Sequence, residues 1–421
     1  MKIGFFTSIE GWGGSEMYLL RLMRGVRERG HEVLLFGVEG TRLWDEAGKV
    51  GIERVAWRSI QPVGGRVLGV EREGDLRVGD DPESTLHSPP STLHPPPSTP
   101  HRLLSTAKQS LLHLMPGGLK LFAGSVREIL HLRRLFKAHP VDVMHVNVHG
   151  YEVAGVACRM AGIASVGMYC VMPHSRRRGI QNWLVYISAS AYSTLCAKSN
   201  GSKNAWCDFL RLRERRFHVI PNGISITGQA CKREYLPVSV LKVVYVGRLH
   251  TLKYIDRLLE VVSLCPPQTV ELLIVGDGES KDDLLRVVSD LEIQDRVRWI
   301  GHVESPSMYY ETADCFVFPP SVVEGCPNSM LEAMATGLPV MTFNVPPMDE
   351  INIDGVTGYN FAVEDTVGFA RALIKLKDDV ASRETLGVAA YDTVLTAFSW
   401  AHTLGSTVAL YSMLRKQEKD R

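Results

Sequence analysis

Short β-rich runs alternate with amphipathic stretches along most of the chain, and this alternation restricts the fold more than any other feature. Repeated β–α–β units build parallel sheets covered by helices, so the predicted fold class is α/β. Helices are predicted over 15–29, 254–264, 281–290 and 328–336. The predicted strands are 2–7, 32–37, 141–147, 165–171 and 217–220 in the first half, and 242–247, 270–276, 296–301, 314–319 and 339–343 in the second.

The length of 421 residues exceeds what one hydrophobic core usually supports, so two domains are expected. Proline, glycine and polar residues replace the periodic pattern over 221–237, which places the boundary there. We predict an N-terminal domain over 1–225, a C-terminal domain over 236–396 and a C-terminal helix or tail over 397–421. Ligands of such folds bind at the carboxyl ends of the strands, so a cleft between the domains is the expected site.

The segment 79–101 departs from this pattern. It contains STLHSPPSTLHPPPSTPH, an approximate seven-residue repeat whose prolines prevent a continuous helix. Its composition cannot bury a core, so we predict a surface insertion of disordered or polyproline-like character. The repeat histidines His87, His94 and His101 are not expected to bind a metal, because a flexible tract does not preorganise ligands.

Several classes of protein are disfavoured by the sequence. The eight cysteines form no C-x-x-C pair, which argues against a zinc site or a disulfide framework. No apolar run reaches the roughly 18 residues of a membrane span, and the first residues lack the features of a signal peptide. Neither half contains G-x-G-x-x-G followed by a suitably spaced acidic residue, so a Rossmann dehydrogenase is not expected. We therefore expect a cytoplasmic protein with no metal, no cofactor and no nucleic-acid partner.

The near-neutral net charge of +1 conceals an uneven distribution. Residues 1–235 hold 31 Lys and Arg against 20 Asp and Glu, whereas residues 236–421 hold 16 against 26. Much of the excess positive charge lies in 127–139, 175–179 and 211–218. Segregation of this kind predicts that the N-terminal half faces an anionic partner, although a solvated basic surface without a partner has the same composition.

Two strand ends carry residues suited to phosphate binding. Gly13 and Gly14 precede the first predicted helix, where glycines allow backbone amides to approach a phosphate and the helix N-terminus adds positive potential. Arg248 and Lys253 follow the strand at 242–247, and two cations at one strand end can bind a diphosphate. Each feature alone also fits an ordinary loop. The Gly-Asp-Gly turn at 276–278 is interpreted as a turn only.

The stretch EGCPNSMLEAMATG, residues 324–337, places two glutamates around a predicted helix start. Asn328 or Ser329 is expected to cap that helix. Asn328 and Glu332 are four residues apart and share one helix face, while Glu324 and Gly325 lie in the preceding loop. Amides for a phosphate, one carboxylate for a ribose and another for sugar hydroxyls together fit a nucleotide-sugar.

The second half closely resembles glycosyltransferase family 4, a family of retaining glycosyltransferases with the GT-B fold. The matching pieces are VGRLHTLK, LLIVGDGES, WIGHV and ADCFVFPPSVVEGCPNSMLEAMATGLPV. The first half matches more loosely, through GGSEMYLLRLMRGVRERGHEV, DVMHVNVHG, MPHS and VIPNGIS. The resemblance implies two Rossmann-like domains facing each other across a cleft, with the C-terminal helix returning to the N-terminal domain.

The resemblance also implies roles for individual residues. Arg248 and Lys253 would neutralise the leaving diphosphate, and His174 would lie near the reacting sugar. Glu332 would bind the ribose, and Glu324 the transferred sugar. The implied nucleotide-sugar site comprises Gly13, Gly14, Arg248, Lys253, Gly301, Val303, Glu324, Gly325, Asn328, Ser329 and Glu332.

Several points remain open at this stage. His145 and His149 are alternatives to His174, although His145, within a predicted strand, is better suited to a structural role. Tyr254 and Ser225 depart from the family pattern, where a glycine and an aspartate are usual; neither change removes a charge from the predicted diphosphate-binding pair. A glycosidase-like covalent role for Glu324 ranks lower, because a glycosidase needs a paired acid.

The implied activity is transfer of a sugar from a nucleoside diphosphate sugar to a glycan, lipid-linked or small-molecule acceptor with retention of configuration. Cationic side chains would stabilise the leaving group in place of a metal. An epimerase or sugar-phosphate synthase of the same fold, or a non-catalytic scaffold, is the alternative. The basic and apolar residues of 127–139 suggest peripheral attachment to an anionic membrane, although a core-packed helix with a basic face fits them equally well.

Overall fold

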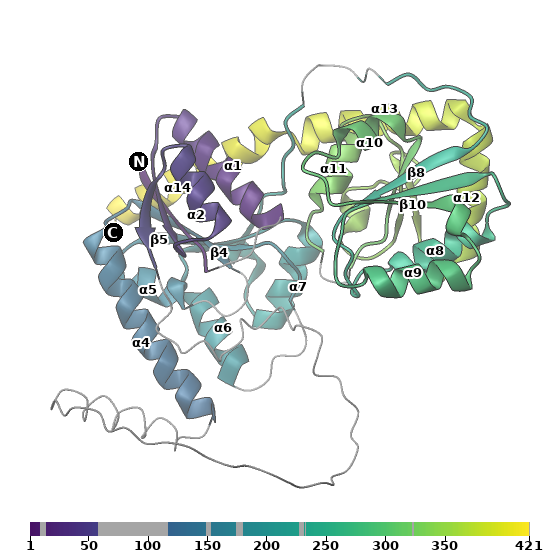
Figure 1. Ribbon diagram of the computed structural model, residues 1–421. Coiled ribbons are helices and arrows are strands. Elements are labelled where there is room, and N and C mark those ends of the chain that lie inside the picture. The colour runs from purple at the N-terminus through teal and green to yellow at the C-terminus, as the bar shows by residue number, and fades with distance from the viewer. Residues whose placement is uncertain are drawn as a thin grey trace, which may run out of the picture.

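The chain forms two lobes, each built around one parallel sheet (Figure 1). The computed structural model describes residues 1–8, 14–57, 117–148, 153–173, 180–226, 231, 233–321 and 324–420. The proline-rich segment 79–101, Gly13, His149 and the stretch from His174 to Gly179 lie outside these described residues.

The N-terminal sheet has seven parallel strands in the order β3-β2-β1-β4-β5-β6-β7. Its central strand β4 is buried on both faces, as expected for a parallel sheet covered by helices. The strands are β1 (Lys2–Phe6), β2 (Glu32–Gly37), β3 (Glu53–Ala56), β4 (Val143–Val148), β5 (Ala164–Tyr169), β6 (Thr194–Ala197) and β7 (Phe217–Val219).

The C-terminal sheet has six parallel strands in the order β10-β9-β8-β11-β12-β13. The strands are β8 (Leu241–Val246), β9 (Val270–Val275), β10 (Val297–Gly301), β11 (Cys315–Phe318), β12 (Val340–Phe343) and β13 (Gly358–Phe361). In both sheets the order reverses next to the first strand, which opens a crevice at the carboxyl ends of the strands. The two Rossmann-like domains confirm the predicted GT-B architecture.

Helices cover both sheets (Figure 1). In the N-terminal lobe they are α1 (Gly14–Glu28), α2 (Arg42–Lys49), α4 (Gly117–Ala138), α5 (Ala154–Ala161), α6 (Ile180–Ala191), α7 (Asn200–Leu210) and the short 3₁₀ helix η1 (Glu214–Arg216). In the C-terminal lobe they are α8 (Ile255–Leu264), α9 (Lys281–Asp290), η2 (Gln294–Arg296), α10 (Ser307–Thr312), α11 (Asn328–Met334), η3 (Met348–Glu350), α12 (Thr366–Asp378) and α13 (Val380–Ala397). The final helix is α14 (Trp400–Lys419).

The last helix, α14, packs on the N-terminal lobe, whereas Phe398, two residues before it, belongs to the C-terminal core. It begins at Ser399, whose side chain accepts a hydrogen bond from the His402 backbone amide. Leu404, Leu410 and Leu414 of α14 then pack into the N-terminal core. The prediction that the C-terminal helix returns to the N-terminal domain is therefore confirmed.

One buried hydrogen bond fixes α14 to the N-terminal sheet. The Tyr411 hydroxyl lies 2.7 Å from Nδ1 of His145, a fully buried residue of β4. Burial and the charge of Lys198 lower the pKa of His145 to about 3, so this imidazole is neutral at physiological pH. His145 therefore has the structural role that its position within a strand indicated.

We expect Tyr411→Phe to lower the free energy of unfolding by about 1–3 kcal/mol, because it leaves a ring nitrogen of His145 buried without its partner. Tyr391→Phe is the matched control, since the buried Tyr391 hydroxyl has no hydrogen-bond partner in the described part of the chain. Urea denaturation of both variants measures the difference. Equal effects of the two changes would show that the Tyr411 hydroxyl contributes nothing specific.

Candidate active site

A cavity of about 320 Å³ lies between the two lobes, at the carboxyl ends of strands from both sheets. The N-terminal lobe contributes the start of α1, the residues after β5 and the residue after β6. The C-terminal lobe contributes the residues after β8 and β11 and the segment that leads into α11. The lining residues are Gly14, Ser15, Tyr18, Cys170, Val171, Lys198, Asn222, Gly247, Lys253, Phe318 and 324–329.

Lys253 and Glu324 form the main charged pair of the cavity. Their Nζ and Oε1 atoms are 2.9 Å apart, and both side chains are largely buried. The Lys253 ammonium also lies 4.9 Å from the centroid of the Phe318 ring. Burial alone would lower the pKa of Lys253, but the Glu324 carboxylate outweighs it, and the pKa lies above its ordinary value. Lys253 is therefore a fixed positive charge in a site partly shielded from water.

The loop before α11 lies against the N-terminal lobe. A Cβ atom at Gly325 would lie 2.2 Å from the carbonyl oxygen of Cys170, so only glycine fits there. Asn222 donates from Nδ2 to Asn328 Oδ1, 2.9 Å away, and to the carbonyl oxygen of Cys326, 2.8 Å away. These contacts join the two lobes at the floor of the cavity.

The predicted capping of α11 is wrong. The residue before the helix is Pro327, and no side-chain cap is formed. Asn328 is instead the first helical residue, and its side-chain oxygen accepts the bond from Asn222. The Asn328 side chain thus helps to join the two lobes. Asn328 and Ser329, both residues of the predicted site, also line the cavity.

Glu332 lies outside the cavity lining but close behind it. Its Oε2 accepts a hydrogen bond of 3.0 Å from the Tyr310 hydroxyl. Burial raises the pKa of Glu332, opposed in part by this hydrogen bond and by the charge of Arg21. Arg21, from α1 of the other lobe, donates to the carbonyl oxygen of Gly223, 3.1 Å away, and stacks on the Trp400 ring at 4.2 Å. The second glutamate is therefore held by residues that the sequence motif did not indicate.

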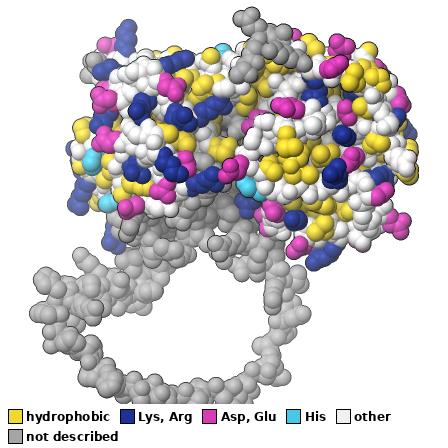
Figure 2. Space-filling view, turned by 45° about the horizontal axis from the view of Figure 1, so that its top comes forward, with side chains coloured by type: hydrophobic (Ala, Val, Ile, Leu, Met, Phe, Trp, Pro, Cys, Tyr) yellow, Lys and Arg dark blue, Asp and Glu magenta, His cyan; other side chains and the backbone are white. Residues whose placement is uncertain are grey.

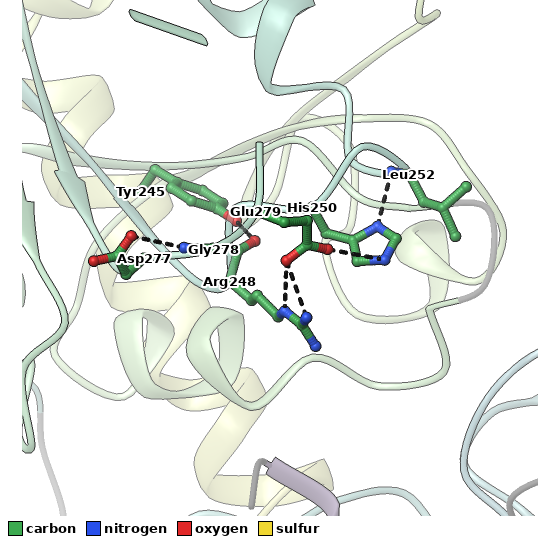
Figure 3. A network of polar contacts seen from close by, with 7 residues as sticks. All are labelled: Tyr245, Arg248, His250, Leu252, Asp277, Gly278 and Glu279. Carbon is green, nitrogen blue, oxygen red and sulfur yellow. Dashed lines mark hydrogen bonds and ion pairs between the residues drawn. The ribbon is translucent and has the colours of Figure 1, made fainter. Parts of the chain in front are cut away.

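Arg248 does not line the cavity, in contrast to Lys253. Its guanidinium donates from Nε and one terminal nitrogen to Oε2 of Glu279, at 3.1 and 2.9 Å (Figure 3). His250 contacts the other Glu279 oxygen at 3.3 Å. The predicted diphosphate-binding pair is therefore split: Lys253 faces the cavity, whereas the largely exposed Arg248 is held by an acidic partner.

The Gly-Asp-Gly stretch does more than form a turn. A Cβ at Gly276 would lie 1.9 Å from the carbonyl oxygen of Gly247, and one at Gly278 would lie 2.1 Å from that of Leu249. The loops after β8 and β9 are thus in direct contact, which brings Glu279 to Arg248. Gly301 ends β10 and accepts the Gly276 backbone amide at 2.8 Å; neither it nor Val303 lines the cavity.

Lys198 is a cavity residue that the sequence analysis missed. It follows β6 and is 2% exposed, with its Nζ 3.6 Å from the centroid of the Tyr18 ring. Burial alone would lower the pKa of Lys198, but the interactions with Tyr18, Cys170 and Cys326 together outweigh it, and the pKa lies above its ordinary value. The sequence signal for Lys198 is weak: a lysine that follows the short run TLCA is usually exposed, and full burial of lysine is rare.

Within the described residues, no cluster of three His, Cys, Asp or Glu side chains is placed to hold a metal ion. All eight cysteines are free, and most are buried.

Comparisons with known proteins identify the family. The profile of Glycosyltransferase Family 4 matches residues 12–227, more than half of the chain, and that of Glycosyl transferases group 1 matches residues 233–393. The chain therefore belongs to glycosyltransferase family 4 and carries the fold and the enzyme class of that family, as its motifs indicated.

Individual proteins that resemble this chain have low sequence identity to it. The chain is 25% identical over 278 residues to UDP-Gal:alpha-D-GlcNAc-diphosphoundecaprenol alpha-1,3-galactosyltransferase of Escherichia coli, covering 60% of this chain and 71% of that protein. It is 31% identical over 163 residues to the lipopolysaccharide core biosynthesis glycosyltransferase LpsE of Rhizobium meliloti, covering 39% and 47%. The crystal structure of Anabaena HepE in complex with UDP superposes with a TM-score of 0.72 at 17% identity, covering 98% and 100%. This last likeness establishes the fold alone.

The raised pKa of Glu332 gives a test of the environment around the cavity. The folded protein retains the Glu332 proton at pH values where the unfolded chain has lost it, so wild-type stability should fall as pH rises from about 4.5. Glu332→Gln should remove this part of the pH dependence. Urea denaturation at a series of pH values gives the difference between the two proteins. A difference that is constant with pH, or of opposite slope, would contradict the assignment; exposed Glu311→Gln controls for loss of a charge.

Proposed function

We propose that this glycosyltransferase transfers a sugar from a nucleoside diphosphate sugar to a glycan, lipid-linked or small-molecule acceptor with retention of anomeric configuration. The observation that carries the proposal is the Lys253–Glu324 pair, buried in the cavity between the lobes. The cavity combines a cation suited to a phosphate with a carboxylate suited to sugar hydroxyls, at the strand ends where α/β proteins bind ligands.

In the proposed reaction, the bond between the anomeric carbon and the diphosphate oxygen breaks, and negative charge develops on the leaving diphosphate. The Lys253 ammonium would stabilise that charge, and its burial strengthens the interaction. Glu324 would then accept hydrogen bonds from hydroxyls of the transferred sugar in place of its bond with Lys253. The acceptor hydroxyl forms the new bond on the face that the diphosphate leaves, and its proton passes to the diphosphate.

Arg248 would join this site only after a change of partner. Its bonds with Glu279 are exposed to solvent, so their net energy is small and a phosphate can replace the carboxylate. The roles proposed for Gly13, Gly14, His174, Gly301, Val303 and Glu332 follow from the family motifs.

The relatives support a particular donor and acceptor class. The Escherichia coli relative is named for transfer from UDP-Gal to a diphosphoundecaprenol-linked sugar, and the Anabaena structure contains UDP. We therefore place UDP-sugars and lipid-linked sugars first among the compounds to test. An epimerase or a sugar-phosphate synthase would instead convert the donor without extending a glycan, and a non-catalytic scaffold would only bind it.

We expect Lys253→Met to lower the rate of transfer by about 100-fold or more, as loss of a transition-state stabiliser does. Glu324→Gln should also lower turnover. The matched control is Lys281→Met, a change at a partly exposed lysine outside the cavity whose nearest carboxylate oxygen, on Asp277, is 3.9 Å away. Transfer rates are measured with a panel of nucleotide-sugars. If Lys253→Met transferred sugar at the wild-type rate, the proposal would be contradicted.

The same rates are measured with a chelator. We expect the chelator to leave the rate of the wild-type enzyme unchanged, because cationic side chains take the place of a metal in the proposed reaction.

Retention of configuration has its own test. Proton NMR of the first product formed from an α-linked donor should show an α-linked sugar. A β-linked product would show inversion and would require a general base that the proposed roles do not include.

The proposal includes an anionic membrane surface as the place where the acceptor is met. The predicted apolar set of 127–139 divides between two faces of α4, because Leu132 and Phe136 are buried in the N-terminal core whereas Leu130 is exposed. The outward stripe of α4 consists of Phe122, Val126 and Leu130, each about 40% exposed and four residues apart.

Aromatic side chains of α6 extend this stripe. The rings of Phe122 and Trp183 have centroids 6.2 Å apart, and Trp183 and Tyr186 are about half exposed. Exposed Arg127 and Arg134 on α4 flank the apolar side chains. Figure 2 shows Lys and Arg side chains spread over the N-terminal half at the left. Apolar rings with basic neighbours suit shallow attachment to anionic lipid. Among the described helices, none has the length and apolar character needed to cross a bilayer.

We expect the protein to sediment with anionic but not with neutral vesicles, and to be released as salt rises, because each basic side chain contributes only about 1 kcal/mol. Phe122→Ser with Trp183→Ser should weaken attachment several-fold. Met308→Ser, a change at a comparably exposed side chain of the other lobe, is the control and should have no effect. Equal binding to both lipids, or to neither, would contradict this part of the proposal.

A further inference from the structure

Lys198 is a buried cation that forms no ion pair with an acidic side chain in the described part of the chain. It is 2% exposed, and its Nζ has no hydrogen-bond partner among the described residues. Its ammonium group lies over the aromatic face of Tyr18, 3.6 Å from the ring centroid. Burying an ammonium group is costly unless something compensates for lost hydration, so this position calls for an explanation.

The surroundings of Lys198 suggest what compensates. Tyr18 belongs to the first turns of α1, a helix of 15 residues whose N-terminal residues Gly14 and Ser15 line the same cavity. The described lining contains two lysines, Lys198 and Lys253, but one carboxylate, that of Glu324, which is 2.9 Å from Lys253. The cavity lining therefore has one more cation than carboxylates, and this cation lies on the N-terminal wall with the first residues of α1; Glu16 of α1 is buried but is not part of the lining.

We propose that Lys198 binds a phosphate oxyanion of a substrate, in a subsite formed with the N-terminal amides of α1 and distinct from the Lys253 side of the cavity. The inference rests on the proposed function, because it takes the cavity as the substrate site. The phosphate belongs either to the donor diphosphate or to a phosphorylated acceptor, and both present the same oxyanion chemistry. An ion pair with the ligand phosphate would thus compensate for the hydration that the Lys198 ammonium loses on burial.

A purely structural role for Lys198 predicts different behaviour. If the cation–π contact with Tyr18 were its only function, replacing the lysine would weaken the packing of β6 against α1 and destabilise the free protein. If it is a binding residue, an apolar side chain of the same length should fit the buried position at least as well in the absence of ligand. Lys198→Met separates these two cases, because methionine keeps the length and removes the charge.

The experiment compares wild type with Lys198→Met and with Lys203→Met, a control five residues further along on α7, where the lysine pairs with Glu214 at 3.1 Å. Thermal melts are recorded without ligand and with pyrophosphate, UDP and uridine. The acceptor KM is then measured with a phosphate-bearing acceptor.

Without ligand, Lys198→Met should melt at or above the wild-type temperature. A drop of at least tenfold in affinity for UDP and pyrophosphate, with uridine binding unchanged, assigns the subsite to the donor. Unchanged UDP affinity with a KM at least tenfold higher for the phosphate-bearing acceptor assigns it to the acceptor.

Two results would overturn the inference. One is a Lys198→Met protein with wild-type affinity for every phosphate ligand and wild-type KM. The other is a Lys198→Met protein whose melting temperature is several degrees lower and whose affinity for every ligand, uridine included, is reduced by the same factor. That result would make Lys198 a structural residue.

The measurements with pyrophosphate keep this test separate from the proposed function. If wild type neither transfers sugar nor binds nucleotides, a loss of stabilisation by pyrophosphate in Lys198→Met still supports the subsite. Equal stabilisation of both proteins by pyrophosphate would then reject it.

Discussion

The close approach of Gly325 to the carbonyl oxygen of Cys170 fixes how the two lobes meet, and the cavity depends on it. A side chain at position 325 would push the loop before α11 away from the residues after β5, and Glu324 would move with it. The bonds from Asn222 to Asn328 and Cys326 support the same contact. Further along the boundary, Glu350 accepts bonds from the backbone amides of Asn200 and Gly201 at the start of α7. The site is therefore shared between lobes.

Much of the fold could be predicted from the sequence, because buried parallel strands are apolar runs bounded by turns. All ten predicted strands are present, whereas β3, β6 and β13 were missed. These three are only four residues long, and ERVA and GYNF contain charged or turn-forming residues. A short strand gains its stability from its neighbours in the sheet, which a local pattern does not record.

Residues of the site could be predicted where their position follows from the order of strands and loops alone. Lys253, Glu324 and Gly325 follow strand ends, so parallel topology brings them to one edge. The partners of the side chains could not be predicted. Arg248 pairs with Glu279 because Gly276 and Gly278 let the loops after β8 and β9 touch. Asn328 accepts a hydrogen bond from Asn222 instead of capping its own helix. Lys198 was missed for a related reason, since its neighbour Tyr18 lies 180 residues earlier in the chain.

The central claim is that the buried Lys253 ammonium receives the donor diphosphate while Glu324 turns to the sugar. A crystal structure with a bound nucleoside diphosphate sugar tests it most directly. The account predicts diphosphate oxygens within about 3 Å of Lys253 Nζ, and a Lys253–Glu324 separation increased from 2.9 Å as the carboxylate contacts sugar hydroxyls. A donor bound elsewhere, or one in the cavity with the Lys253–Glu324 pair intact and the diphosphate remote from both, would contradict it.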